Sequence, residues 1–199
     1  IQVTGEAVIT SKPDQSVVVL AVETENTNAA AAVQENAKLA DQVIAALKKA
    51  GVKADQIKTG SYYLYSFTDR PAPDSTKEPI TRYRATNSIT LRLSNIDTVG
   101  KIIDTAINAG ANNVQSVRFE LKNSEAAKLQ ALEAATKQAK AKADAVAKGA
   151  GVKITGIKSI TEESASYTPY RATFEMDMAK ETAVSTPIVP GDVEVNARV

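Results

Sequence analysis

The chain has 199 residues, of which 43% are hydrophobic and 24% are charged. This balance predicts a folded chain with a packed core, and the length allows one domain or two small ones. A net charge of +1 argues against a dedicated nucleic-acid binder. Because the chain has no Cys and no His, disulfides, thiol catalysis, a Ser–His–Asp triad and metal sites built on Cys or His are excluded.

Two strands are expected first, over residues 1–10 and 16–24, with a turn at Pro13 and Asp14 between them. The second strand is apolar on both faces, which predicts a central place in a sheet or a second covering layer. A helix is expected next, from about Thr27 to Ala50, because apolar residues recur in alternate steps of four and three. Its predicted buried stripe is Val33, Ala37, Ala40, Ile44 and Leu47.

A Tyr-rich strand over residues 56–67 follows, and then a loop that contains Pro71, Pro73 and Pro79. Residues 82–93 alternate apolar and polar residues, which predicts a strand with one basic and polar face. A short helix is expected from Ser94 or Asn95 to Gly110, and another strand over 113–122.

The third helix is expected from Asn123 or Ser124 to about Lys148, with a strand over 152–163 after it and a closing strand over 193–199. Residues 164–186 hold Pro169 and many small residues, and they are assigned to no element. The order ββαββαβαββ predicts an α+β fold with long helices packed on a largely antiparallel sheet. The predicted stripe of the third helix keeps heptad spacing: Leu129, Leu132, Thr136, Ala139, Ala143, Val146 and Ala150.

One short frame occurs twice in the chain, 100 positions apart. Ala50-Gly51-Val52-Lys53 recurs as Ala150-Gly151-Val152-Lys153, and Ile57-Lys58-Thr59 recurs as Ile157-Lys158-Ser159. Each copy follows a helical pattern and precedes a strand-like one, which predicts a duplicated strand–helix–strand unit. Gly51 and Gly151 are expected to end the helices in the left-handed conformation that glycine adopts cheaply.

The best candidates for recognition are aromatic and Arg side chains on the two central strands, since both residue types are enriched in interface cores. The alternatives are a half-buried strand under a covering loop and a solvated sheet face. The predicted interface residues are Tyr62, Tyr63, Tyr65, Phe67, Arg82, Arg84 and Arg92.

No catalytic, cofactor-binding or metal-binding residue is predicted. Ser124 and Lys128 lie one helical turn apart, but a helix-start Ser beside an exposed Lys explains them better than a nucleophile pair does. Glu162, Glu163 and Asp177 are expected to be surface carboxylates. The lysines of the third helix favour a solvated face over a membrane or nucleic-acid surface, because acidic residues share the helix.

Three segments resemble the SIMPL-domain family, whose members are bacterial and archaeal envelope proteins. The first is Val3-Thr4-Gly5-Glu6-Ala7 with Lys12-Pro13-Asp14. The second runs from Tyr83-Arg84-Ala85-Thr86-Asn87 through Val99-Gly100 to Ala109-Gly110-Ala111-Asn112. The third is Thr186-Pro187-Ile188-Val189-Pro190-Gly191 with Val193-Glu194-Val195. The family pattern has a second Gly where this chain has Ala7, and its closing strand extends a few residues beyond Val199.

The resemblance implies one SIMPL-like domain over residues 1–199, with sub-modules at 1–67 plus 113–199 and a central strand–helix insertion at 81–112. It also implies a non-enzymatic periplasmic or secreted protein without cofactors, with a signal peptide removed before Ile1. The resemblance further implies homo-oligomers, which are sometimes ring-like. It also implies a structural or stress-related role and peripheral association with the outer membrane. The alternatives are a module that binds a small ligand or a partner protein and, third, a hydrolase that uses Ser, Lys or carboxylates.

Overall fold

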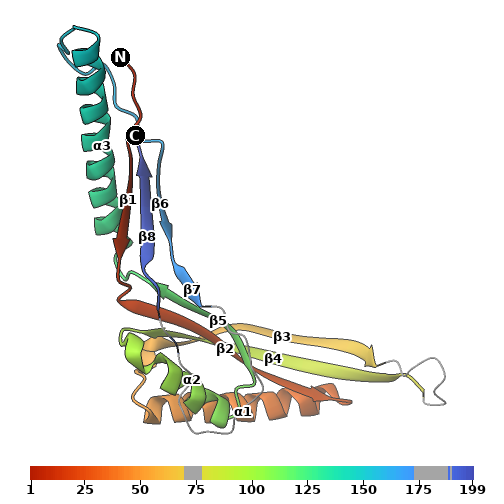
Figure 1. Cartoon of the computed structure of the whole chain (residues 1–199). Coiled ribbons are helices and arrows are strands. Elements are labelled where there is room, and N and C mark those ends of the chain that lie inside the picture. Colours follow the sequence, from red (N-terminus) through yellow and green to blue (C-terminus); the bar gives the residue numbers. More distant parts are fainter. Residues whose placement is uncertain (70–77, 173–187, 189) are drawn as a thin grey trace. The chain divides into compact units, whose positions relative to one another are not determined.

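The computed structural model describes residues 1–69, 78–172, 188 and 190–199, which form two compact units. The central unit is Gln15–Arg118 with Arg171–Val189. The terminal unit holds both chain ends and consists of Ile1–Asp14, Phe119–Tyr170 and Pro190–Val199. Helices and antiparallel sheets are both present, which confirms the α+β class (Figure 1). The single domain over residues 1–199 stays a prediction, and the segment 81–112 lies within the central unit.

The central unit is built on β2 (Gln15–Asn26), β4 (Ile80–Leu93) and β3 (Ile57–Asp69). They belong to a five-stranded sheet of order β3-β4-β2-β5-β7, in which β5 is Asn113–Glu120 and β7 is Tyr170–Ala172. β2 is the middle strand, so its expected central position is confirmed. Its apolar residues are buried on both faces, with Val18, Leu20 and Val22 on one face and Val17 and Ala21 on the other.

Two helices, α1 (Ala29–Lys49) and α2 (Val99–Asn108), cover one face of this sheet (Figure 1). The Asn28 side chain caps α1 by accepting a hydrogen bond from the Ala31 N–H at 3.0 Å. Two short 3₁₀ helices precede β3 and α2, at Ala54–Gln56 and Ile96–Thr98. The predicted stripe of α1 is partly wrong, because Ala37 is exposed and the buried residues are Ala32, Asn36, Ala40, Val43 and Leu47.

Asn36 explains this shift of the buried stripe. Its side chain is completely buried, and its Nδ2 donates to the carbonyl oxygens of Val22 at 2.8 Å and Ala85 at 2.9 Å. These carbonyls belong to neighbouring strands, β2 and β4. A polar residue that hydrophobic spacing would place outside therefore faces the sheet, because backbone acceptors there satisfy its donors.

The terminal unit consists of a three-stranded antiparallel sheet and α3 (Ser124–Gly149), which lies along it (Figure 1). The strand order is β1 (Glu6–Ser11), β8 (Val193–Arg198) and β6 (Ser164–Thr168). The core is made of small side chains, with Ala127, Ala131 and Ala135 of α3 packed against Val195 and Ala197 of β8. The predicted stripe of α3 is wrong in part, because Leu129 and Val146 are 60% and 50% exposed.

Gly5 shows how closely α3 approaches the sheet. A Cβ atom at this position would lie 2.0 Å from the carbonyl oxygen of Ala135 and 2.7 Å from the backbone N of Ala139. Gly5 also exchanges two backbone hydrogen bonds with Val199, each of 3.0 Å. Only a residue without a side chain fits between this backbone pairing and the helix.

Both copies of the repeated frame end their helices in the same way. Gly51 and Gly151 have φ of 96° and 67°, as predicted. The N–H groups of Val52 and Val152 each donate at 3.0 Å to a carbonyl five residues earlier, on Leu47 and Ala147. The two glycine N–H groups also bond back into the last turn, so each end is a Schellman motif.

The strand predicted over residues 152–163 is wrong. These residues have no regular secondary structure, and the strand begins at Ser164. Val52 is 5% exposed whereas Val152 is 53% exposed. The first copy continues into β3 because β4 pairs with it from Ile57 onward. β8 pairs with β6 from Ser164, and no strand within the described residues pairs with 152–162.

The segment left unassigned, 164–186, contains β6 and β7 in its described part. The remainder of it, residues 173–186, lies outside the described residues, as do Pro71 and Pro73 of the predicted loop. Pro79, which precedes β4, is exposed.

We expect Gly5→Ala to lower the free energy of unfolding of the terminal unit by about 1–3 kcal/mol or more, because the new methyl group overlaps the backbone of α3. Urea unfolding followed by circular dichroism measures this loss. Gly149→Ala is the matched control, since nothing lies within 4 Å of its added Cβ. We expect the control to stay within about 1 kcal/mol of the parent, and an equal loss in both variants would contradict the close approach.

We expect Asn36→Ala to lower the free energy of unfolding by about 1–3 kcal/mol, because two buried hydrogen bonds to the strands are lost. The exposed neighbour Gln34 provides a control, Gln34→Ala, with an expected change within about 0.5 kcal/mol. The same urea titration compares the two variants. A neutral Asn36→Ala would show that the two bonds do not hold α1 on the sheet.

Candidate functional site

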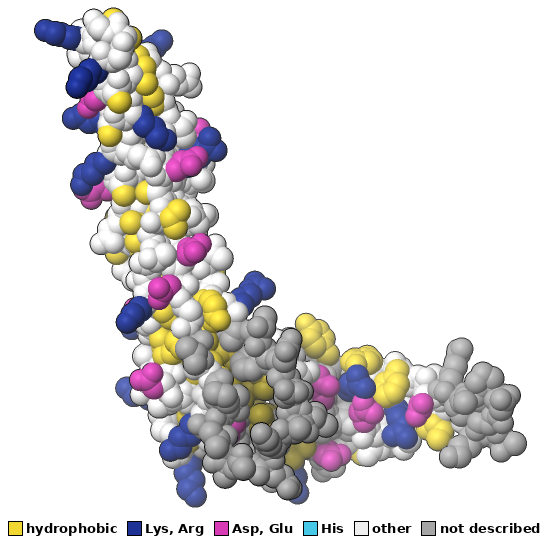
Figure 2. Space-filling model, in the orientation of Figure 1, with side chains coloured by type: hydrophobic (Ala, Val, Ile, Leu, Met, Phe, Trp, Pro, Cys, Tyr) yellow, Lys and Arg dark blue, Asp and Glu magenta, His cyan; other side chains and the backbone are white. Residues whose placement is uncertain are grey.

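The predicted interface residues lie on β3 and β4, at one end of the sheet order of the central unit. Within the described part of the chain, β3 pairs with β4 on one side and with no strand on the other. A row of its backbone N–H and C=O groups is therefore open to another chain. Exposed fractions along β3 are 48% for Tyr62, 60% for Tyr63, 44% for Leu64 and 46% for Tyr65. Figure 2 shows hydrophobic and charged side chains together along these strands.

A β-bulge decides which aromatic side chains share a face of the sheet. The register of β3 against β4 shifts by one residue between Thr59 and Tyr62. The Ser61 N–H donates there to Oγ of Ser88 at 2.7 Å, and a Cβ on Gly60 would lie 2.6 Å from the same Oγ. Because side chains alternate along a strand, this one extra residue moves every later side chain of β3 to the opposite face.

Beyond the bulge, Tyr63, Tyr65 and Phe67 lie opposite Thr86, Arg84 and Arg82. These three aromatic residues therefore occupy the face opposite α1, which is the face that Arg82, Arg84 and Arg92 of β4 share. Tyr62 pairs with Asn87 and lies on the other face. The structure thus brings together Tyr63, Tyr65, Phe67, Arg82 and Arg84, which we call the Tyr–Arg surface.

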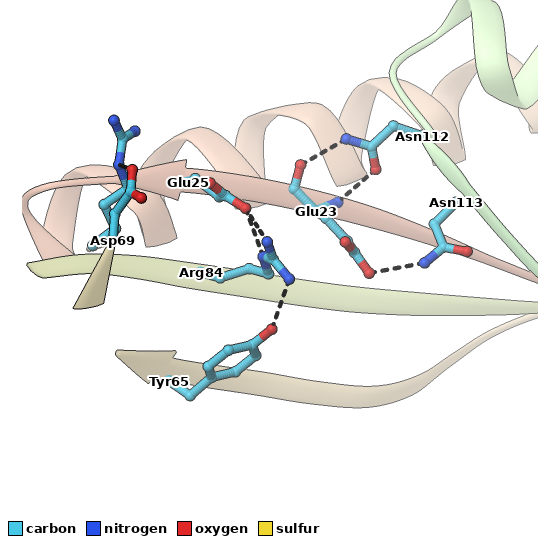
Figure 3. A network of polar contacts seen from close by, with 8 residues as sticks. Glu23, Glu25, Tyr65, Asp69, Arg84, Asn112 and Asn113 are labelled. Atoms are coloured by element: carbon cyan, nitrogen blue, oxygen red, sulfur yellow. Dashed lines mark hydrogen bonds and ion pairs between the residues drawn. The ribbon is translucent and has the colours of Figure 1, made fainter. Parts of the chain in front are cut away.

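Arg84 is the centre of this surface (Figure 3). Its Nε donates to Oε1 of Glu25 at 2.7 Å, and its Nη2 bonds the same oxygen. Its Nη1 donates to the hydroxyl oxygen of Tyr65 at 3.0 Å. The guanidinium carbon lies 5.1 Å from the ring centroid of Phe67 and 5.9 Å from that of Tyr65, within the range of cation–π attraction.

These contacts keep the guanidinium group of Arg84 charged and fix its position. The hydrogen bond to Glu25, and then the one to Tyr65, raise the pKa of Arg84 above its usual value. Beside it, Nε of Arg82 lies 3.6 Å from a carboxylate oxygen of Asp69. The surface therefore presents a Tyr65 ring that is held by the Glu25–Arg84 pair, and both of its Arg side chains lie beside a carboxylate.

The predicted residue Arg92 is not part of this surface. It pairs with Val17 at the opposite end of β4, and the eight residues that separate it from Arg84 span about 26 Å of strand. Its charge is exposed there, away from the aromatic rings.

Sequence reasoning missed the polar contacts that Glu23 of β2 makes with Asn112 and Asn113 at the start of β5. Asn112 accepts a hydrogen bond from the Glu23 N–H at 2.8 Å and donates to the Glu23 carbonyl at 2.7 Å. Asn113 Nδ2 then donates to the Glu23 carboxylate at 2.9 Å (Figure 3). The sequence signal for these contacts was the pair Glu23 and Glu25, which lie on one face of an otherwise apolar strand. Their partners could be named only once the register was known.

The other candidate groups that the structure describes pair with neighbouring side chains rather than with one another. Lys128 pairs with Glu125 at 3.9 Å, and Glu163 pairs with Arg198 at 2.9 Å. Asp177 lies outside the described residues. In the described part of the chain, no cluster of Asp and Glu could hold a metal ion.

A hollow in the central unit has a volume of about 250 Å³ and is lined by the end of α1, the end of β4 and the start of α2. Pockets for drug-sized ligands measure roughly 300–1,000 Å³. The hollow is therefore small for such a ligand.

Comparisons with known proteins bear on the family of the chain. The chain matches the SIMPL family model, described as a protein of unknown function (DUF541), over residues 1–199. It is 31% identical over 206 residues to the 26 kDa periplasmic immunogenic protein of Brucella melitensis biotype 1 and of Brucella abortus strain S19, with 100% of this chain and 82% of each relative covered. It is 22% identical over 165 residues to the uncharacterized protein YggE of Edwardsiella ictaluri, which covers 83% of this chain and 68% of that protein.

The fold and the site define an α+β protein with an open, aromatic sheet edge. The chain belongs to the SIMPL family, which confirms the resemblance carried by its three motifs. The names of the Brucella relatives place it in the periplasm. None of the helices among the described residues has the length and hydrophobicity that crossing a membrane requires.

We expect a double-mutant cycle of Glu25→Gln and Arg84→Gln to give a coupling energy below about 1 kcal/mol that falls with added salt. The reason is that both side chains are about a third exposed, so solvent screens their attraction. Urea unfolding of the four proteins at low and high salt measures the coupling. A coupling that is large and independent of salt would show that the pair is shielded from solvent.

Proposed function

We propose that this chain is a non-enzymatic periplasmic protein that self-associates through the open edge of β3 and the Tyr–Arg surface. The observation that carries the proposal is an edge strand of 13 residues with four adjacent residues, Tyr62 to Tyr65, that are between 44% and 60% exposed. Soluble proteins normally protect such edges with charges, Pro or a covering element, because an open edge pairs with other chains.

The contact we propose has two parts. Backbone N–H and C=O groups of β3 pair with an edge of a second copy, as in other cases of strand addition. The tyrosine rings beside the edge then lose contact with water, while the Glu25–Arg84–Tyr65 bonds keep the Tyr65 ring in place. Tyrosine suits this position because its ring is apolar and its hydroxyl can remain hydrogen-bonded.

The contact is head-to-tail when β3 pairs with a different edge of the next copy, and we propose that its repetition around an axis closes a ring rather than a filament. The role that we propose for such an assembly is a structural or stress-related one in the cell envelope. The non-enzymatic part of the proposal is supported by the lack of His and Cys and by the pairing of the candidate Lys and Glu side chains with surface partners.

We expect Tyr63→Ser with Tyr65→Ser to dissociate the assembly while the monomer stays folded, because both rings are exposed and little core packing is lost. Leu64→Lys should do the same by placing a charge on the edge. Light scattering on a sizing column, over a range of concentrations, gives the native mass, and circular dichroism checks the fold.

Ile107→Ser is the matched control, since Ile107 is a 41% exposed apolar residue of α2 in the same unit. It should keep the parent mass. If the parent chain is a 21.0 kDa monomer at all concentrations, self-association is wrong and the ligand-binding alternative takes precedence. If the Tyr and Lys variants keep the mass of a larger parent, β3 is not the contact.

A further inference from the structure

The hollow at the end of α1 has no part in the proposed self-association. It lies within the central unit, with a volume of about 250 Å³, where α1 and β4 end and α2 begins. An apolar cavity of about 150 Å³ is large enough to hold a benzene molecule. The hollow therefore has room for one ring, or for a short branched chain, together with a polar group.

The floor of the hollow is aliphatic. It is formed by Val52, which follows α1, by Leu93, the last residue of β4, and by Ile102, near the start of α2. The exposed fractions of these residues are 5%, 4% and 5%. Apolar ligand surface that lies on this floor is removed from water, which favours binding.

The rim of the hollow offers hydrogen-bond donors. Gln56 and Asn95 line it, and the oxygen of each side-chain amide is already used by a backbone group. Oε1 of Gln56 accepts from the Lys53 N–H at 3.0 Å, and Oδ1 of Asn95 accepts from the Asp97 N–H at 3.2 Å. The side-chain NH₂ groups, which only donate, are therefore what these two amides present to a ligand.

The charge around the hollow is positive. Lys101 is the one charged residue that lines it, and Lys101 takes part in no ion pair with another described residue. The two segments that meet here, 48–56 and 94–102, contain four lysines and two aspartates, which gives a net charge of +2. Both aspartates, Asp55 and Asp97, lie outside the lining. Donors and positive charge together favour an anion.

We propose that the hollow binds a small organic anion, namely a carboxylate that carries one ring or a short branched chain. The apolar part of the ligand lies on the aliphatic floor. Its carboxylate accepts hydrogen bonds from Lys101 Nζ and from the amide groups of Gln56 and Asn95. An apolar floor with a few polar groups that fix the orientation is the usual composition of a small-molecule site.

The repeated frame of the sequence contributes one wall of this site. Ala50, Gly51 and Val52 of its first copy line the hollow. Val152 of the second copy is 53% exposed and forms no such floor. The first copy becomes part of a site because β4 and α2 supply the other walls, so the frame alone does not predict a ligand.

The proposal goes beyond self-association and does not depend on it, since none of its residues lies on β3. The probes are benzoate and benzamide, which have the same ring and nearly the same size but differ in charge. Saturation-transfer difference NMR reads the signals of the probe, so it works with the full chain at any native mass. We expect saturable binding of benzoate, and binding of benzamide that is weaker by roughly twofold to fivefold.

Two variants separate the charged and the apolar contributions. Lys101→Gln should weaken benzoate binding by roughly twofold to fivefold, because an exposed charge is screened by solvent, and should leave benzamide binding unchanged. Lys38→Gln is its matched control, since Lys38 is an exposed lysine of α1 that does not line the hollow. It should bind both probes like the parent.

Ala50→Trp should abolish the binding of both probes, because Ala50 is an exposed residue of the lining and the new ring fills the hollow. Ala37→Trp is the matched control, since Ala37 is an exposed residue of α1 outside the lining, and it should bind like the parent. Circular dichroism checks that each variant is folded.

Four outcomes would overturn the proposal. The parent chain gives no saturable signal with benzoate; it binds benzamide as tightly as benzoate; Lys101→Gln binds benzoate like the parent, or its control loses as much; or Ala50→Trp still binds either probe. Light scattering of these variants should give the native mass of the parent. Failure of probe binding therefore leaves self-association untouched, and the β3 variants report on self-association alone.

Discussion

The antiparallel ladder between β2 and β4 is the constraint on which the central unit depends. Its register places Leu20 opposite Ile89 and Val18 opposite Leu91, so the two strands share one apolar face on which α1 packs. The same register places Glu25 opposite Arg84 on the other face. A slip of one residue would exchange the two faces and bury the charges. The core and the charged centre of the Tyr–Arg surface are therefore consequences of one set of backbone pairings.

The β-bulge in β3 also determines which aromatic side chains lie on which face of the sheet. Without the extra residue near Gly60 and Ser61, Tyr63 and Tyr65 would lie on the α1 face, and Tyr62 would lie on the face of Arg84. The bulge interrupts the regular backbone hydrogen bonds between β3 and β4. Oγ of Ser88 compensates by accepting a hydrogen bond from the Ser61 N–H and donating one to the Ser61 carbonyl. One hydroxyl group thus supports the change of face that brings Tyr65 into hydrogen-bonding distance of Arg84.

The core of the terminal unit differs from that of the central unit. Its helix α3 packs on the sheet through close approach of the backbone rather than through large side chains. Alanines of α3 and Gly5 allow contact so close that a single methyl group at Gly5 would not fit. Each Ala buries little apolar area, whereas the larger residues Leu129 and Val146 of the same helix are exposed.

Local signals in the sequence determined the helices, their ends and most strands. Gly51 and Gly151 ended α1 and α3 because the left-handed conformation is a property of one residue. The alternation of β4 and the two apolar faces of β2 likewise showed where each strand lies, and the three family motifs identified the SIMPL family. Of the predicted interface, the Tyr-rich strand and the Arg-bearing face were visible, but their partners were not.

Tertiary structure alone decided which residues meet, because pairing depends on segments far apart in the chain. The same Ala-Gly-Val-Lys frame leads to a paired strand after Gly51 and to an exposed segment after Gly151, since β4 offers a partner to only the first copy. Asn36 faces inward because carbonyls of two strands lie within its reach. Arg92 is separated from Arg84 by strand length, and Tyr62 from Tyr63 by strand alternation. The spacing of hydrophobic residues indicates which secondary structure one segment favours. The contacts named above form only when another segment of the chain supplies the partner.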